Sequence, residues 1–478
     1  MREAAAALWF TIIYLPATLL IAWRRPLWND EMFTWYIAGR PRIGDIWTAL
    51  LTGAEQIPPA FYWITRPFVG HAEWAMRLPE ILGFWLMGVC VIAIVARRAP
   101  AAYGLVAALA ALFTGAYPYA YEGRPYGIVL GLAALALLAW QRGWTAALAL
   151  ALAAAVSVHY YAVLLFAPLA AGEAVRTWRA GRLQWRVWAA LAAGAAPLVA
   201  WLPLIRGARS YSGTFWARPG YGSLAEFLPF LFDFRALPLA VVLIAAGAWL
   251  LARPKSVAPG EATPLEETAA AVGFMALPVL AVAIGKAATG AYAHRYALAA
   301  AAGFCVFAAW ALAAIFGGRT RPALAIAAPL SVLFFARAAW DYREASRQAA
   351  RHAHMIEYLE SRAEAALPIV IADPHVFFEL SHYAPRPLAR RLRYYADAKL
   401  ARRYVGTDTV DRGLLAMRQW APLDVEPFPP REREFLIYGH PSVYAWLVPE
   451  LARRGFPMEI TGSIEERLLV RAGAPGAR

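Results

Sequence analysis

An acidic pair, Asp30 and Glu31, follows the first long apolar run of the chain, residues 4–23. Carboxylates so close to a membrane-length apolar run are costly unless they face water, a partner or a substrate. A carboxylate in an enclosed site can act as a general base that removes a proton from an attacking hydroxyl group. Two alternatives stay open: Asn29 or Asp30 caps the start of a helix, or the acidic pair holds a divalent cation. We treat Asp30 and Glu31 as candidate catalytic residues.

A second polar group, Glu122 and Arg124, lies just before an apolar run that begins at Tyr126. An ionisable pair in this position must be neutralised by a partner or must face a polar cavity. The guanidinium of Arg124 suits a phosphate, and Glu122 suits a sugar or a partner arginine. The alternative is an interfacial ion pair, with Pro125 in the first turn of the next helix.

Further cations precede the apolar run 297–316, where His294 and Arg295 are adjacent and Lys286 lies nearby. This pattern predicts a cationic clamp for a leaving phosphate. The alternative is an arginine whose side chain reaches the membrane interface beside tyrosines. His159, at the end of another apolar run, is a candidate substrate contact or an ordinary hydrogen-bonded interfacial histidine.

The composition indicates that these residues are held by an integral membrane protein. Of the 478 residues, 61% are hydrophobic and 16% are charged, whereas soluble domains are about one quarter charged. The net charge of +14 favours anionic lipid or lipid phosphate as partner, and the sequence contains no nucleic-acid-binding motif. Cys90 and Cys305 both lie in apolar runs, so we expect neither a disulfide nor a thiolate metal site.

Roughly eleven apolar runs approach the length of about 20 residues that a membrane-spanning helix needs. Lysine or arginine in each loop after an even-numbered run predicts a cytoplasmic N-terminus. The predicted spans are residues 4–23, 76–96, 100–118, 126–141, 144–157, 160–175, 187–205, 236–252, 268–285, 297–316 and 322–340.

Two domains are expected from this pattern. Residues 1–340 predict a transmembrane catalytic domain whose large first outer loop covers 24–75. Residues 341–478 are more charged, have shorter apolar runs, and predict a small α/β domain outside the cytoplasm. Within that domain we expect helices at 342–366, 407–420 and 443–454, and strands at 368–373, 435–438 and 468–470.

The ordered polar landmarks of residues 1–300 resemble the bacterial members of the dolichyl-phosphate-mannose protein mannosyltransferase superfamily. These are GT-C glycosyltransferases, in the branch that includes the aminoarabinose and galacturonic-acid transferases. The aminoarabinose-type relatives carry a lysine before a double proline, where this chain has Ile57, so we expect no lysine–phosphate contact there. The landmarks are Asp30-Glu31, Pro58-Pro59-Ala60-Phe61-Tyr62-Trp63, Arg77-Leu78-Pro79, Glu122-Gly123-Arg124-Pro125-Tyr126 and Arg295-Tyr296.

The resemblance implies a GT-C fold and a polyprenyl- or dolichyl-phosphate-linked sugar as donor. It also implies inverting transfer, on the outer face of the membrane, to a glycan, lipid or protein acceptor. Asp30 matches the catalytic carboxylate of the family. Glu122 lies where relatives carry an acid in the second outer loop, and it is a further candidate catalytic residue. We further expect donor-phosphate binding by Arg124, Arg295, Arg77 and Lys286, and substrate or lipid contacts by Tyr62, Trp63, Tyr126, His159 and His294.

Two other function classes were weighed against a glycosyltransferase. A transporter or flippase of lipid-linked sugar would place ionisable residues near the membrane midplane, on broken helices related by repeats. The apolar runs here are mostly Ala, Leu and Val, and no repeat is seen. A receptor would leave the polar landmarks unexplained. The sequence therefore favours a multi-pass enzyme of the cell membrane, with a periplasmic or extracellular C-terminal domain and no resident cofactor unless the cation alternative holds.

Overall fold

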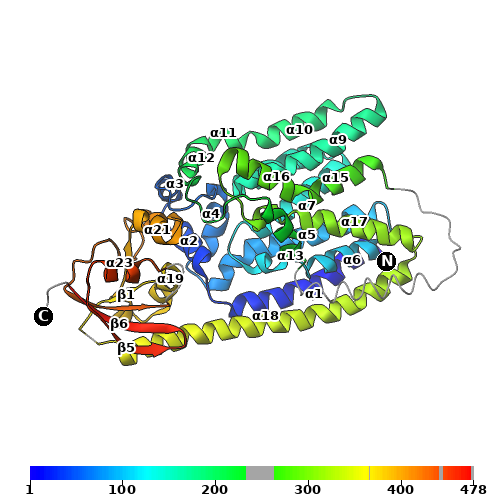
Figure 1. Cartoon of the computed structure of the whole chain (residues 1–478). Coiled ribbons are helices and arrows are strands. Elements are labelled where there is room, and N and C mark those ends of the chain that lie inside the picture. Colours follow the sequence, from blue (N-terminus) through cyan, green and yellow to red (C-terminus); the bar gives the residue numbers. More distant parts are fainter. Residues whose placement is uncertain (233–262, 365, 441–444, 475–478) are drawn as a thin grey trace. The chain divides into compact units, whose positions relative to one another are not determined.

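The computed structural model describes residues 1–232, 263–364, 366–440 and 445–474 (Figure 1). The predicted span at 236–252 lies outside these residues. The chain is mostly helical, with one small sheet near its C-terminus, and it divides into two compact units. The helical unit comprises Met1–Arg24, Ile57–Leu202 and Arg218–Arg343, and the mixed unit comprises Arg25–Gln56, Pro203–Ala217 and Glu344–Arg478.

The helical unit is built from apolar helices rich in alanine and leucine. Three helices are long and apolar enough to cross a membrane, or up to five if each bent helix pair counts as one span, among the described residues. The principal elements are α1 (Glu3–Arg24), α4 (Pro59–Thr65), α5 (Leu78–Ala96), α6 (Ala101–Ala111), α7 (Tyr126–Arg142), α8 (Thr145–Val158), α9 (Phe166–Ala180), α10 (Trp185–Ala195), α11 (Pro197–Ala200), α13 (Gly222–Leu231), α15 (Leu265–Met275), α16 (Leu277–Ile284), α17 (Ala300–Ile315) and the first part of α18 (Thr320–Arg362).

Glycines bring α5 and α7 into close contact. A Cβ on Gly127 would lie 2.5 Å from the carbonyl oxygen of Glu80, and a Cβ on Gly83 would lie 2.5 Å from the carbonyl oxygen of Gly127. Gly127 and Gly131 form a small-xxx-small pattern, which lets helix backbones approach in an apolar environment. The contact fixes the start of α7, directly after the Glu122–Arg124 segment.

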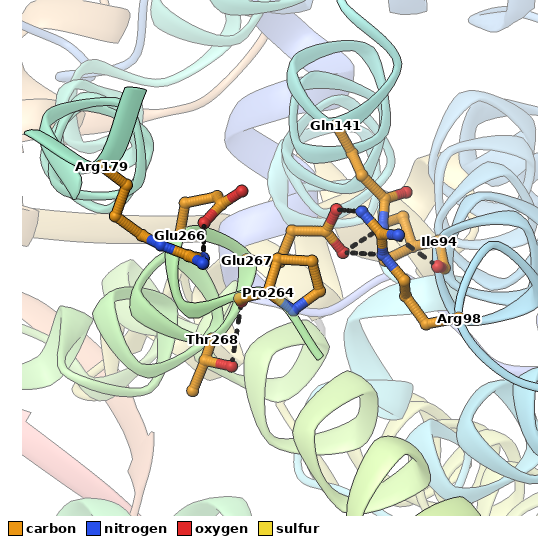
Figure 2. Close-up of polar contacts among 8 residues, drawn as sticks. All are labelled: Ile94, Arg98, Gln141, Arg179, Pro264, Glu266, Glu267 and Thr268. Atoms are coloured by element: carbon orange, nitrogen blue, oxygen red, sulfur yellow. Dashed lines mark hydrogen bonds and ion pairs between the residues drawn. The ribbon is translucent and has the colours of Figure 1, made fainter. Parts of the chain in front are cut away.

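A buried ionic cluster joins the C-terminal ends of α5 and α7 to the start of α15 (Figure 2). Glu267 accepts hydrogen bonds from Nε of Arg98 at 3.0 Å and from Nε2 of Gln141 at 2.8 Å. Its neighbour Glu266 pairs with Arg179 of α9 at 2.9 Å. Glu267 is 3% exposed. A buried carboxylate needs such partners, so this cluster fixes the start of α15.

Helix α18 differs from the expectation of a span at 322–340 followed by a separate helix at 342–366. It runs unbroken from Thr320 to Arg362, with Pro329 inside it. The residues around Asp341 are polar but include neither glycine nor proline, so the change in polarity does not break the helix. The predicted domain boundary after residue 340 therefore lies inside a helix.

The mixed unit contains a six-stranded sheet in the order β3-β2-β1-β4-β6-β5. Strands β1 to β4 run parallel to one another. Strand β6 pairs antiparallel with β4, and β5 pairs antiparallel with β6. The strands predicted at 368–373, 435–438 and 468–470 are found, whereas those at 392–396, 425–427 and 458–464 were missed. The strands are β1 (Ile369–Ile371), β2 (Leu392–Ala396), β3 (Val425–Pro427), β4 (Glu434–Gly439), β5 (Met458–Ile464) and β6 (Arg467–Gly473).

Short helices complete the mixed unit. The sequence predicted α22 and α23 within 407–420 and 443–454. Segments from distant parts of the sequence join the same unit, since α2 and α3 precede the sheet by some 300 residues and still belong to it. The helices are α2 (Asn29–Ala38), α3 (Ile43–Leu51), α12 (Leu202–Ala208), the last part of α18, α19 (Pro374–Tyr383), α20 (Arg386–Ala389), α21 (Ala398–Val405), α22 (Thr409–Met417) and α23 (Leu447–Arg453).

Candidate active site

The acidic pair lies in the first turn of α2. The backbone N–H of Trp28 donates to Oε2 of Glu31 at 3.3 Å, and the Glu31 side chain is fully buried. A carboxylate in the first turn of a helix can satisfy an N–H group at its start in this way, whereas the capping alternative names Asn29 or Asp30; the N-cap residue is Trp28. Asp30 is half-buried, and Nδ2 of Asn29 approaches its Oδ1 at 3.5 Å. The capping contact thus occupies Glu31, and the catalytic roles of both acids stay predictions.

Three ionisable side chains of the helical unit gather where α5 and α7 begin. Glu122 and Arg124 are 4% and 3% exposed, and Glu80 is fully buried. The charges of Glu122 and Arg124 both act on Glu80, whose Oε2 accepts a hydrogen bond from the backbone N–H of Ile128 at 3.0 Å. The predicted pair is therefore part of a larger buried polar group.

A second polar cluster holds the segment before Glu122 in place. Arg337 of α18 donates to the carbonyl oxygen of Leu112 at 2.6 Å and pairs with Asp341 at 3.5 Å. The hydroxyl of Tyr121 donates to Asp341 at 3.2 Å. Sequence reasoning missed Glu80, Arg337 and Asp341. The available signal was the same for all three: an ionisable residue within or beside an apolar run.

A small pocket lies beside this region. The guanidinium of Arg295 lies over the ring of Tyr126, 5.6 Å from its centroid. The charges of both Arg124 and Arg295 act on His159. The pocket is lined by Tyr126, Val129, Leu130, His159, Tyr161, Ala162, Leu164, Leu165, Leu277, Arg295, Tyr296, Leu298 and Ala299.

Aromatic rings and hydrogen bonds fix the wall of this pocket. The ring centroid of His159 lies 5.3 Å from those of Tyr126 and Tyr296. Nδ1 of His159 accepts from the backbone N–H of Tyr161 at 3.2 Å, and the rings of Tyr161 and Tyr296 stack at 4.4 Å. The hydroxyl of Tyr161 meets that of Thr289 at 2.6 Å. Three of the predicted residues, Tyr126, His159 and Arg295, are thus brought together.

Three other predicted residues lie outside the lining of this pocket. Arg77 is fully buried and donates to the carbonyl oxygen of Ala22 at 2.7 Å, near the end of α1. Lys286 is exposed, with its ammonium 3.8 Å from the ring centroid of Tyr221. His294 lies 3.6 Å from a carboxylate oxygen of Glu226. Arg77 thus anchors a helix, Lys286 lies at the surface, and His294 forms a half-buried contact with Glu226.

The two predicted lipid-contacting aromatics of α4 differ in exposure. Tyr62 is fully buried beside Phe61, with ring centroids 5.0 Å apart. Trp63 is half-buried, and its ring lies 5.9 Å from that of Trp201. Trp63 therefore offers the larger accessible apolar surface of the two.

A metal site needs several His, Cys, Asp or Glu side chains close together. No group of three or more His, Cys, Asp or Glu side chains there has the arrangement that could hold a metal ion. Nothing in the structure tests the divalent-cation alternative for Asp30 and Glu31.

The chain matches no family model and no curated protein sequence. Its fold is similar to that of ArnT from Cupriavidus metallidurans in the apo state, with a TM-score of 0.59 at 15% identity over 98% of both chains. It is also similar to ArnT from the same organism bound to undecaprenyl phosphate, with a TM-score of 0.58 at 14% identity over 97% of both chains. The fold expected from the family resemblance is confirmed by this likeness to two solved ArnT structures.

Proposed function

We propose that this chain is a membrane glycosyltransferase. It transfers a sugar from a polyprenyl-phosphate-linked donor to an acceptor hydroxyl group, on the outer face of the cell membrane and with inversion. The observation that carries the proposal is the pocket described above, which combines a cationic residue, Arg295, with a wall of leucine and tyrosine side chains. A phosphate attached to a long apolar chain needs this combination. The fold shared with an ArnT structure bound to undecaprenyl phosphate supports the same ligand class.

The reaction is a single displacement. The acceptor oxygen attacks the anomeric carbon of the sugar while the bond from that carbon to the phosphate oxygen breaks. The electron pair of that bond leaves with the polyprenyl phosphate, and the carboxylate of Asp30 takes the acceptor proton. Attack opposite the leaving group inverts the configuration of the carbon. We assign the base to Asp30 and not to Glu31, because Glu31 already accepts a hydrogen bond from the backbone N–H of Trp28.

We assign the leaving phosphate to Arg295 and Arg124. Both guanidinium charges act on the same pocket residue, His159, and fixed positive charge in a partly buried site stabilises developing negative charge on the leaving group. Lys286 is exposed and faces Tyr221, so its charge is screened by solvent. Tyr126, Tyr161 and Tyr296 supply the apolar and hydrogen-bonding surface around the phosphate.

A donor panel tests the proposal. The protein is purified into lipid nanodiscs and mixed with polyprenyl-phosphate sugars that differ in the sugar, with cell-envelope extract as a source of acceptors. Mass spectrometry follows free polyprenyl phosphate and the glycosylated product, with and without EDTA. We expect one donor to be consumed with matching amounts of both products. Movement of lipid-linked sugar across liposome membranes without sugar transfer would instead favour a flippase.

A further inference from the structure

The sheet of the mixed unit creates a distinctive position at the carboxyl end of β1. The chain passes from β1 outward to β2 and β3 on one side, and then returns to β4 on the other side. In parallel sheets, functional side chains gather at the carboxyl ends of the strands where the strand order reverses in this way. Asp373 and His375 follow β1 directly at this position. The sequence predicts Asp373 as the end of a strand and places His375 in no helix or strand.

Asp373 and His375 form a local pair. Oδ1 of Asp373 accepts the backbone N–H of His375 at 2.8 Å and so caps the start of α19. The same oxygen lies 3.4 Å from Nδ1 of the His375 ring. A carboxylate on one ring nitrogen fixes the orientation of an imidazole and favours its protonated form. The remaining ring nitrogen, Nε2, is then presented away from Asp373.

Helix α2 packs against α19 within the mixed unit, through the faces that carry Asp30 and His375. The rings of Phe33 and Phe378 contact each other with centroids 4.8 Å apart. Asp30 lies three residues before Phe33, and His375 lies three residues before Phe378, so each shares a helix face with the contacting ring. The backbone N–H of Leu27 also donates to the hydroxyl of Tyr383 at 2.7 Å, which anchors the start of α2.

The charge of Asp30 acts on His375. Burial alone lowers the pKa of this histidine, but the hydrogen bond and charge of Asp373 outweigh that effect, with further contributions from Asp30 on α2 and Glu379 on α19. The net result is a pKa above the ordinary 6.5. His352 of α18 faces the same Glu379 at 3.1 Å. The charges of three carboxylates thus act on one imidazole.

We propose that His375, oriented by Asp373, is a positioning residue that holds the carboxylate of Asp30 in place for proton abstraction. The proposal rests on the proposed function, because it assumes that Asp30 is the base. The acceptor proton passes to Asp30 and then to solvent, while His375 keeps its own proton throughout. The α/β part of the chain thereby contributes directly to the chemistry.

The test compares transfer kinetics of His375→Gln and His382→Gln with wild type between pH 5.5 and 9. His382 is the matched control. Its ring contacts Trp35 and Tyr36 of the same helix α2, but it is not one of the groups that shift the pKa of His375. Wild-type kcat should fall towards alkaline pH, because His375 loses its proton at a pH above the ordinary 6.5. His375→Gln should lower kcat about tenfold near pH 6.5, leave the donor KM within twofold, and remove this alkaline decline.

Asp373→Asn gives a second readout, which also decides the matter if His375→Gln does not fold. Losing the Asp373 charge should shift the alkaline decline to lower pH. Wild-type pH dependence in both variants would overturn the proposal, as would an equal loss in His375→Gln and His382→Gln with the pH profile unchanged. Failure of the proposed function is separate, since it would appear as no sugar transfer by the wild type. Undiminished transfer by Asp30→Asn would show that Asp30 is not the base and would overturn this proposal with it.

Discussion

Replacement of Arg295 by glutamine should selectively impair departure of the phosphate. Arg295 is half-buried in the pocket wall and lies over Tyr126. Two charges about 4 Å apart attract by about 4 kcal/mol at an effective dielectric constant near 20. Solvent at the pocket mouth and the second cation, Arg124, reduce the loss to roughly 2–3 kcal/mol, or about 30- to 150-fold in rate.

Lys286→Gln is the matched control for this prediction. It removes one positive charge near Arg295 in sequence, but the ammonium group is exposed and contacts Tyr221. Screening by solvent should keep its effect on kcat/KM below about threefold. The assay measures release of polyprenyl phosphate at several donor concentrations. Equal losses in the two variants, or an Arg295→Gln enzyme with wild-type kcat/KM, would refute the assignment of the phosphate site.

Three further predictions concern the scaffold. Gly127→Ala should destabilise the protein by about 1–3 kcal/mol, because the new Cβ would meet the Glu80 carbonyl at 2.5 Å; thermal unfolding checks this against Gly44→Ala, where nothing lies within 4 Å. Glu267→Ala should destabilise by up to about 3 kcal/mol by leaving Arg98 and Gln141 without their carboxylate, and equal thermal midpoints for variant and wild type would contradict it. Burial raises the pKa of Asp411 to about 7, above the ordinary 3.8. The folded chain therefore binds more protons than the unfolded chain between these values, so the free energy of unfolding should fall as pH rises from about 4 to 7, by at most roughly 4 kcal/mol. Hydrogen exchange of β2 and α22, corrected for intrinsic rates, should show this decline in wild type and a flat profile in Asp411→Asn.

The strands of the mixed unit show which parts of the fold a sequence can predict. Strands β1 and β4 are runs of apolar β-branched and aromatic residues, so their pattern was readable. Strand β5 is largely exposed and β2 begins between two arginines, so neither carries a clear apolar pattern. The sequence predicts a break near residue 341 from the change in polarity there, but α18 continues because no helix-breaking residue accompanies that change.

The candidate site shows a similar division. Glu122, Arg124 and Arg295 were predictable because charges next to apolar runs are unusual. The pairing of His375 with Asp30's helix was not predictable, since it depends on the packing of α2 against α19, which are far apart in the sequence. The capping contact of Glu31 was not predictable either, since it depends on the backbone position of Trp28.

Asp30 is the proposed base of the sugar transfer. The most direct measurement compares initial transfer rates of wild type, Asp30→Asn and Glu31→Gln in nanodiscs, with the donor identified by the panel and with donor binding measured in parallel. We predict that Asp30→Asn binds the donor normally but transfers sugar roughly 10²- to 10⁴-fold more slowly, while Glu31→Gln retains most of its activity. Transfer by Asp30→Asn at the wild-type rate would contradict the account.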